Sequence, residues 1–186
     1  PDFLELNISC PNVEDEFGLP FALDPRAAAE VTRAVRRIFA GRLFVKLSPN
    51  APNLVEVARA IADAGADGLT AVNTLGPGML LDLYARRPIL ANRVGGLSGP
   101  AIHPIAVRCV YEVSQAVKVP IIGTGGVSSG ADALRMVMAG ATAVGIGSAL
   151  YGEGEAVFGR ILREMKEIME KEGIPSLEAI RGCAHA

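Results

Sequence analysis

Amide, thiol and ammonium groups follow the short apolar runs of this chain, at the point where each run ends. The first run closes on residues 7–12 (Asn-Ile-Ser-Cys-Pro-Asn), the second on Lys46 and the third on Asn73 and Thr74. An amide both donates and accepts hydrogen bonds, which suits a flat heterocycle with C=O and N–H groups at its edge. A free thiol has a pKa of about 8.5 and could act as a base near neutral pH. Cys10 is therefore a candidate base, unless it is an inert small side chain before a turn-making proline.

Glycines close two later runs, with Gly125-Gly126 after one and Gly147-Ser148 after the next. In barrel folds the loops after the last strands bind phosphate through backbone N–H groups, together with the helix that follows. Two such corners favour a phosphate site, although a pair of tight turns would use the same residues. The Lys46 side chain could stand beside an anionic ring or extend its ammonium group to water.

The elements that must position these residues alternate between apolar runs and amphipathic stretches, which predicts an α/β fold with a parallel sheet. Asn7 and Ser9 share one face of the first strand because strand side chains alternate. Residues 73–99 show no clear element, and a loop of that length is usually functional. We expect strands at 3–9, 43–47, 68–72, 120–123 and 143–146, and helices at 25–39, 53–64, 101–117, 129–139 and 155–172.

The length of the chain raises a question about the closure of the sheet. Its 186 residues suffice for one domain. A (β/α)8 barrel needs about 250 residues and eight strands, however, and the pattern shows only five, of which the first opens the chain. We expect residues 1–186 to be the C-terminal part of a single TIM (β/α)8 barrel domain, without roughly the first three βα units.

Composition excludes several classes of function. There are 18 Lys and Arg against 20 Asp and Glu, a net charge of -2, so we expect no nucleic-acid partner. No apolar run reaches the roughly 18 residues of a membrane span and no signal segment opens the chain, so we expect a soluble cytoplasmic protein. The 3 cysteines have no paired spacing, and His103 and His185 have no matching ligands, so we expect no disulfide framework and no metal site.

Taken together, the strand ends resemble the dihydroorotate dehydrogenases. The likeness keeps the order and spacing of that family through residues 5–13, 45–48, 72–75, 95–102 and 121–127, and covers essentially the whole chain. Residues 95–100 and 110–116 most resemble the cytosolic class 1B, which works with a separate iron–sulfur and FAD subunit and reduces NAD. Cys10 agrees with a cytosolic class, because the membrane-linked class of the family uses serine as its base.

The resemblance implies oxidation of dihydroorotate to orotate in pyrimidine biosynthesis. Cys10 would remove the C5 proton while hydride leaves C6 for the flavin of FMN. It also implies a homodimer that passes electrons to NAD through the partner subunit, which would hold the FAD and the iron–sulfur cluster. The pyrimidine would be held by Asn7, Asn12, Asn73 and Thr74, and FMN by Asn7, Lys46, Val72, Gly99, Gly125, Gly126, Gly147 and Ser148.

Within that assignment Lys46 would lie near the flavin N1 and O2, and the residues from Gly125 to Ser148 would bind the phosphate. Ser148 stands where many relatives have threonine, a change that keeps the hydroxyl group. The family's N-terminal strands supply a further lysine and an Asn-Gly loop, and these are not in this chain. We therefore expect the chain by itself to bind FMN weakly and to have no turnover.

Three other interpretations remain open. A tRNA dihydrouridine synthase is also an FMN barrel with a cysteine, but it needs a basic surface and a His-Gly-Arg segment, where this chain has residues 73–76 (Asn-Thr-Leu-Gly). Dihydropyrimidine dehydrogenase has a similar flavin half and would differ in its preference for uracil. An inactive fragment that serves only as an interaction module would hold no flavin.

Overall fold

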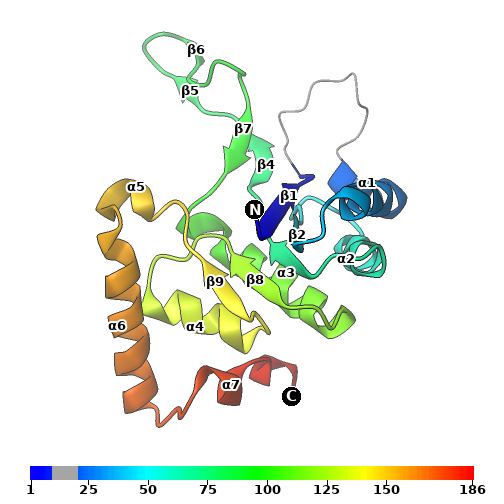
Figure 1. Cartoon of the computed structure of the whole chain (residues 1–186). Coiled ribbons are helices and arrows are strands. Elements are labelled where there is room, and N and C mark those ends of the chain that lie inside the picture. The colour runs from blue at the N-terminus through cyan, green and yellow to red at the C-terminus, as the bar shows by residue number, and fades with distance from the viewer. Residues whose placement is uncertain (10–20) are drawn as a thin grey trace.

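A five-stranded parallel sheet forms the centre of the molecule, as a computed structural model of the chain shows for residues 1–9 and 21–186 (Figure 1). The strand order is β1-β2-β3-β8-β9, and every neighbouring pair is parallel. All five predicted strands are confirmed. Their bounds are β1 (Phe3–Asn7), β2 (Arg42–Lys46), β3 (Gly68–Ala71), β8 (Ile121–Thr124) and β9 (Ala143–Gly145).

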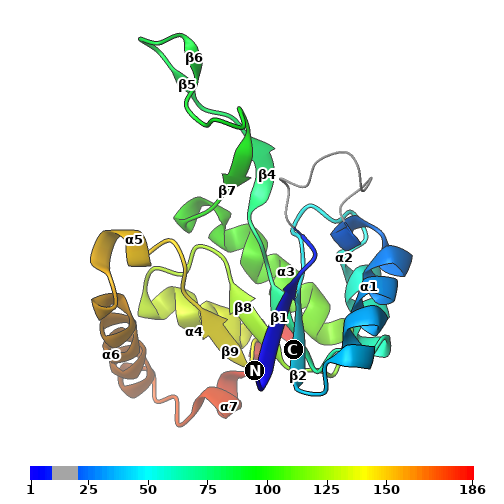
Figure 2. The same ribbon diagram turned by 45° about the horizontal axis from the view of Figure 1, so that its top comes forward.

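Helices connect the strands and flank the sheet, with α1 and α2 beside β1 and β2, and α4 beside β8 and β9 (Figure 2). The five predicted helices are confirmed as α1 (Pro25–Ile38), α2 (Leu54–Asp63), α3 (His103–Ala116), α4 (Gly130–Met138) and α6 (Ala156–Lys171). Shorter turns are α5 (Leu150–Glu153), α7 (Leu177–Ile180), η2 (Phe21–Leu23), η3 (Pro100–Ile102) and η4 (Cys183–His185). Within residues 1–9 and 21–186, none of the helices has the length and apolar character that crossing a membrane requires.

Local sequence signals set where these helices begin and end. The Asp24 carboxylate caps α1 by accepting hydrogen bonds from the backbone N–H groups of Arg26 and Ala27 at 2.7 and 3.2 Å. Pro25 occupies the first helical position, where no N–H donor is needed. Gly65 after α2 and Gly140 after α4 adopt φ angles of 100° and 112°, a conformation that ends a helix at little cost only in glycine.

Apolar side chains fill the layer between the sheet and its helices. Leu43 and Val45 of β2 and Leu69 of β3 are fully buried there, against side chains of α2 and α3 such as Ile61 and Val110. Because strand side chains alternate, the neighbouring positions face the other side of the sheet. Polar groups occupy that side: Glu5 and Asn7 from β1, Lys46 from β2 and Thr70 from β3. The strand order, the parallel pairing and this two-sided pattern match part of a (β/α)8 barrel.

Residues 73–99 contain four short strands, so the prediction of a segment without a clear element was wrong. Strand β4 (Leu75–Gly78) pairs antiparallel with β7 (Gly95–Leu97), and β5 (Leu81–Asp82) pairs with β6 (Arg87–Pro88). Each pair is short and rich in glycine, proline and leucine, without the β-branched alternation by which strands are predicted. These pairs make a β arm, residues 75–97, that projects from the end of the sheet where the parallel strands finish (Figures 1 and 2).

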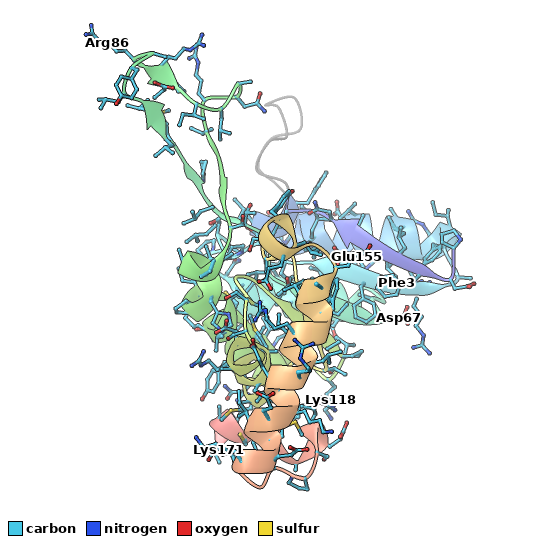
Figure 3. All side chains as sticks on the ribbon, turned by 90° about the vertical axis from the view of Figure 1, so that its left-hand side faces the viewer. Phe3, Asp67, Arg86, Lys118, Glu155 and Lys171 are labelled. Carbon is cyan, nitrogen blue, oxygen red and sulfur yellow. The ribbon has the colours of Figure 1, made fainter. Side chains whose placement is uncertain are left out.

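The β arm and the C-terminal elements lie at opposite ends of the molecule (Figure 1). Arg86 lies at the tip of the β arm, Lys171 ends α6 at the opposite end of the molecule, and Glu155, which precedes α6, lies between them (Figure 3). The chain then returns to pack against α3, where the His185 ring stacks on Tyr111 with centroids 4.5 Å apart. His185 Nε2 also lies 3.1 Å from Ser114 Oγ. These contacts hold the C-terminal residues against α3.

Candidate functional site

A pocket of about 140 Å³ opens at the carboxyl ends of β2, β3, β8 and β9, next to the base of the β arm. In parallel α/β folds this end of the sheet is where ligands bind. Its volume is smaller than the roughly 300 to 1,000 Å³ of pockets that enclose a whole ligand, so it would contact part of a nucleotide-sized molecule. The lining residues are Lys46, Val72, Asn73, Thr74, Ser98, Gly99, Ile102, Thr124, Gly125, Gly126, Gly147 and Ser148.

Beside the pocket, three polar side chains at or just beyond the carboxyl ends of β1 and β3 form one hydrogen-bonded cluster. Asn73 Nδ2 donates to Ser9 Oγ at 2.8 Å and to Asn7 Oδ1 at 3.2 Å, and Ser9 Oγ donates to Asn7 Oδ1 at 3.0 Å. The Asn73 oxygen in turn accepts from the Thr74 backbone N–H at 2.8 Å. In the described part of the chain Asn7 Nδ2 donates to no protein acceptor, so this amide can donate to a ligand.

Glycine corners from β8 and β9 supply backbone donors to the same pocket. The N–H groups of Gly125, Gly126, Gly147 and Ser148 donate no hydrogen bond within residues 1–9 and 21–186. Gly126 has a φ of 68°, and a Cβ there would collide with the Gly99 carbonyl oxygen and lie 3.0 Å from the His103 Cβ. Unpartnered N–H groups on a concave turn attract anions. Since none of the described residues that line the pocket is a carboxylate, the pocket fits a phosphate-bearing group.

The buried side chain of His103 contacts the first glycine corner, Gly125-Gly126. His103 is 7% exposed, its Nδ1 lies 3.0 Å from the Gly125 carbonyl oxygen, and its Nε2 lies 3.5 Å from Asp132 Oδ1. Burial opposes the charged form of Asp132, but hydrogen bonds from Ser129 and Ser128 outweigh it and lower the pKa of this carboxyl. An ionised carboxylate therefore faces the outer nitrogen of the imidazole.

An ion-pair network fixes the loop that follows the corner to α6. Arg160 pairs with Glu153 and Glu164 at 2.6 Å each and donates to the Ser128 carbonyl oxygen at 3.0 Å. The other Glu164 oxygen accepts from the Gly130 N–H at 2.6 Å, and this hydrogen bond, with the Arg160 guanidinium, lowers the pKa of Glu164. Contacts from α3 and α6 therefore hold both the glycine corner and the loop that follows it.

Lys46 is the only charged side chain among the described residues that line the pocket. Its Nζ lies 3.1 Å from Glu5 Oε1, and Thr70 Oγ1 donates to Glu5 Oε2 at 2.7 Å. Strand alternation puts Glu5 on the same face of β1 as Asn7. The structure supplies two partners, and it shows that Lys46 does not simply extend to water.

Most residues predicted for the site lie together, although their roles stay predictions. Asn7 lies beside the pocket, where its side chain accepts a hydrogen bond from Asn73, which lines it. Cys10 and Asn12 lie outside the described residues. Sequence reasoning missed Ser98, Ile102, Thr124 and the supporting His103, because a single hydroxyl, apolar or histidine side chain carries no spacing signal. In the described ranges no group of three or more His, Cys, Asp or Glu side chains could hold a metal ion. The predicted residues that line the pocket are Lys46, Val72, Asn73, Thr74, Gly99, Gly125, Gly126, Gly147 and Ser148.

Comparison with known proteins places the chain among relatives with the same fold. Residues 1–169 match the family described as dihydroorotate dehydrogenase. The dihydroorotate dehydrogenase B (NAD(+)) catalytic subunits of Bacillus pumilus and Geotalea uraniireducens are each 51% identical over 96% and 97% of this chain. The chain spans 57% and 58% of those two proteins. A crystal structure of ligand-free DHODH from Eimeria tenella has a TM-score of 0.81 at 24% identity, covering 100% of this chain and 56% of that one.

Proposed function

Because this chain belongs to the dihydroorotate dehydrogenase family, we propose that the protein oxidises dihydroorotate to orotate in pyrimidine biosynthesis. Residues 1–186 would be the C-terminal portion of a single FMN-binding (β/α)8 barrel domain. The observation that carries the proposal is the pocket itself. It combines a lysine, an amide cluster and unpartnered backbone N–H groups at the end of the sheet where ligands bind.

FMN is the cofactor that these groups fit. The N–H groups of Gly125, Gly126, Gly147 and Ser148 would bind its phosphate, and Lys46, Val72 and Gly99 would lie along the flavin, with Asn7 nearby. When bound, FMN supplies the acceptor for the hydride that leaves C6 of the substrate. The ammonium of Lys46 would stabilise negative charge that develops on the flavin ring.

Proton removal completes the proposed oxidation. The Cys10 thiolate would take the proton from C5 of dihydroorotate as hydride leaves C6, so that the C5–C6 single bond becomes a double bond. Asn7, Asn12, Asn73 and Thr74 would hold the pyrimidine through its C=O and N–H groups. The hydrogen bonds of Asn73 to Asn7 and Ser9 support this assignment, because they keep its amide in one orientation.

The electrons would leave through a second protein. The curated relatives are named catalytic subunits, which supports a partner subunit. We propose a cytoplasmic homodimer with an electron-transfer subunit that holds FAD and an iron–sulfur cluster and reduces NAD. The β arm offers contact area for such partners, because its exposed apolar side chains include Met79, Leu80, Leu81, Leu83, Tyr84 and Ile89.

Anaerobic titration of the full-length protein tests the proposal. The purified protein should carry flavin absorbance, and dihydroorotate should bleach it while dihydrouracil leaves it unchanged. Bleaching by dihydrouracil alone would indicate a dihydropyrimidine dehydrogenase, and a colourless protein that reconstitution with FMN does not load would refute the flavin assignment. The chain of residues 1–186 alone should bind FMN weakly and show no turnover, since it spans 57% of the length of its curated relatives.

A further inference from the structure

Glu5, Lys46 and Thr70 form a connected set on the inner side of the sheet. One oxygen of the Glu5 carboxylate lies 3.1 Å from Lys46 Nζ, and the other accepts a hydrogen bond from Thr70 Oγ1 at 2.7 Å. The Glu5 and Lys46 side chains are 32% and 26% exposed, and Thr70 is 2% exposed. Both carboxylate oxygens are therefore engaged by residues of neighbouring strands.

Strand register brings these residues together although they are far apart in sequence. In the parallel pairing Asn7 lies opposite Lys46, and Lys46 lies opposite Thr70. Glu5 is two residues before Asn7, so its side chain points to the same face and reaches across to both neighbours. The position of the carboxylate is therefore set by the register of the parallel sheet.

The carboxylate acts on the one charged group that lines the described pocket. An ammonium group offers several N–H donors, and only one of those of Lys46 is needed by Glu5. The others remain available toward the pocket. In the described part of the chain Glu5 is also the only carboxylate that contacts Lys46, so it alone can offset the lysine's charge there.

We propose that Glu5 is a positioning residue that acts through Lys46: its carboxylate offsets part of the Lys46 charge at the pocket and thereby lowers the reduction potential of the bound flavin. This inference rests on the proposed function. A cation beside the flavin ring favours the more negative, reduced form, and a carboxylate beside that cation weakens the effect. Thr70 supports the arrangement because its hydrogen bond keeps the carboxylate against the ammonium group.

The test is a spectroelectrochemical titration of the flavin in the full-length protein and its Glu5→Gln variant. Glutamine keeps the size of the side chain and an acceptor for Thr70, but it removes the charge. The midpoint potential should move to a more positive value. Glu112→Gln is the matched control, because Glu112 pairs with Arg108 at 2.9 Å on α3 and does not line the pocket. That control should leave the potential unchanged.

Two further variants separate the possible outcomes. Lys46→Gln should lower the midpoint potential, and Thr70→Val should raise it by less than Glu5→Gln does, since the carboxylate is then held less firmly. If Lys46→Gln lowers the potential while neither Glu5→Gln nor Thr70→Val moves it, the positioning role is wrong. If the unaltered protein holds no flavin, or Lys46→Gln has no effect, the flavin assignment of the pocket fails as well.

Discussion

The imidazole Nδ1 of His103 lies 3.0 Å from the carbonyl oxygen of Gly125, so that a buried side chain at the start of α3 supports the glycine corner of the pocket. Within residues 1–9 and 21–186 the N–H groups of Gly125 and Gly126 donate no hydrogen bond, so they are available to an anion. A corner that is already in its binding conformation loses little conformational entropy when an anion binds.

Replacement of His103 by alanine should therefore weaken flavin binding. The Gly125 carbonyl oxygen would lose its partner, and an unsatisfied buried acceptor costs about 1–3 kcal/mol. We expect the affinity of full-length protein for FMN, measured by fluorescence titration, to fall about tenfold, or about 1.4 kcal/mol. His103→Asn should restore most of the affinity, because its amide can donate to the same oxygen. Equal affinities for the Ala and Asn variants would contradict a role for the hydrogen bond.

A methyl group at Gly126 should disrupt the same corner more strongly. Its φ of 68° is unfavourable for any side chain, at a cost of about 1–3 kcal/mol, and the added carbon would press on the Gly99 carbonyl oxygen. We expect Gly126→Ala to lower the melting temperature and to lose bound flavin. Gly152→Ala is the matched control, since an added Cβ at Gly152 has nothing within 4 Å. Retention of wild-type flavin content by Gly126→Ala would show that the corner adjusts freely.

The parallel sheet could be predicted because each of its strands is a run of apolar residues. That pattern can be seen in the sequence of the strand itself, without knowledge of its neighbours. Leu43, Val45 and Leu69 follow this rule, and each is fully buried. The β arm could not be predicted, because strands as short as β5 and β6 are held by pairing with each other and carry few β-branched residues.

The contacts that support the site could not be predicted from the sequence, for a different reason. Glu5 and Lys46 are 41 residues apart in sequence, and His103 and Gly125 are 22 apart, so only the strand register and helix packing bring them into contact. Residues at strand ends, such as Asn73 and Gly126, could be identified because the fold class alone fixes where strand ends meet.

Cys10→Ala should separate flavin binding from flavin reduction. Removal of the base should leave FMN bound, while reduction by dihydroorotate in stopped-flow measurements should fall by at least about 100-fold. Cys109 cannot take over this role, because burial raises the pKa of its thiol to about 11. Cys183→Ala is the control, since that thiol is exposed in the C-terminal segment. Unchanged reduction in the Cys10 variant would refute its assignment as the base.

Asp132 should make the fold sensitive to acid. Although burial opposes its charge, the hydrogen bonds from Ser129 and Ser128 lower the pKa of this carboxyl below its ordinary value of 3.8. A carboxyl whose pKa is lower in the folded state stabilises the fold above its unfolded-state pKa, and this stabilisation is lost as the pH falls through the folded-state pKa. Urea unfolding should therefore show a smaller loss of stability between pH 6 and pH 3, about the range of carboxyl titration, in Asp132→Asn than in the wild type. Asp63→Asn, which changes an exposed carboxylate at the end of α2, is the matched control for the loss of one negative charge. Identical pH dependence in the wild type and Asp132→Asn would mean that this carboxylate does not stabilise the loop behind the pocket.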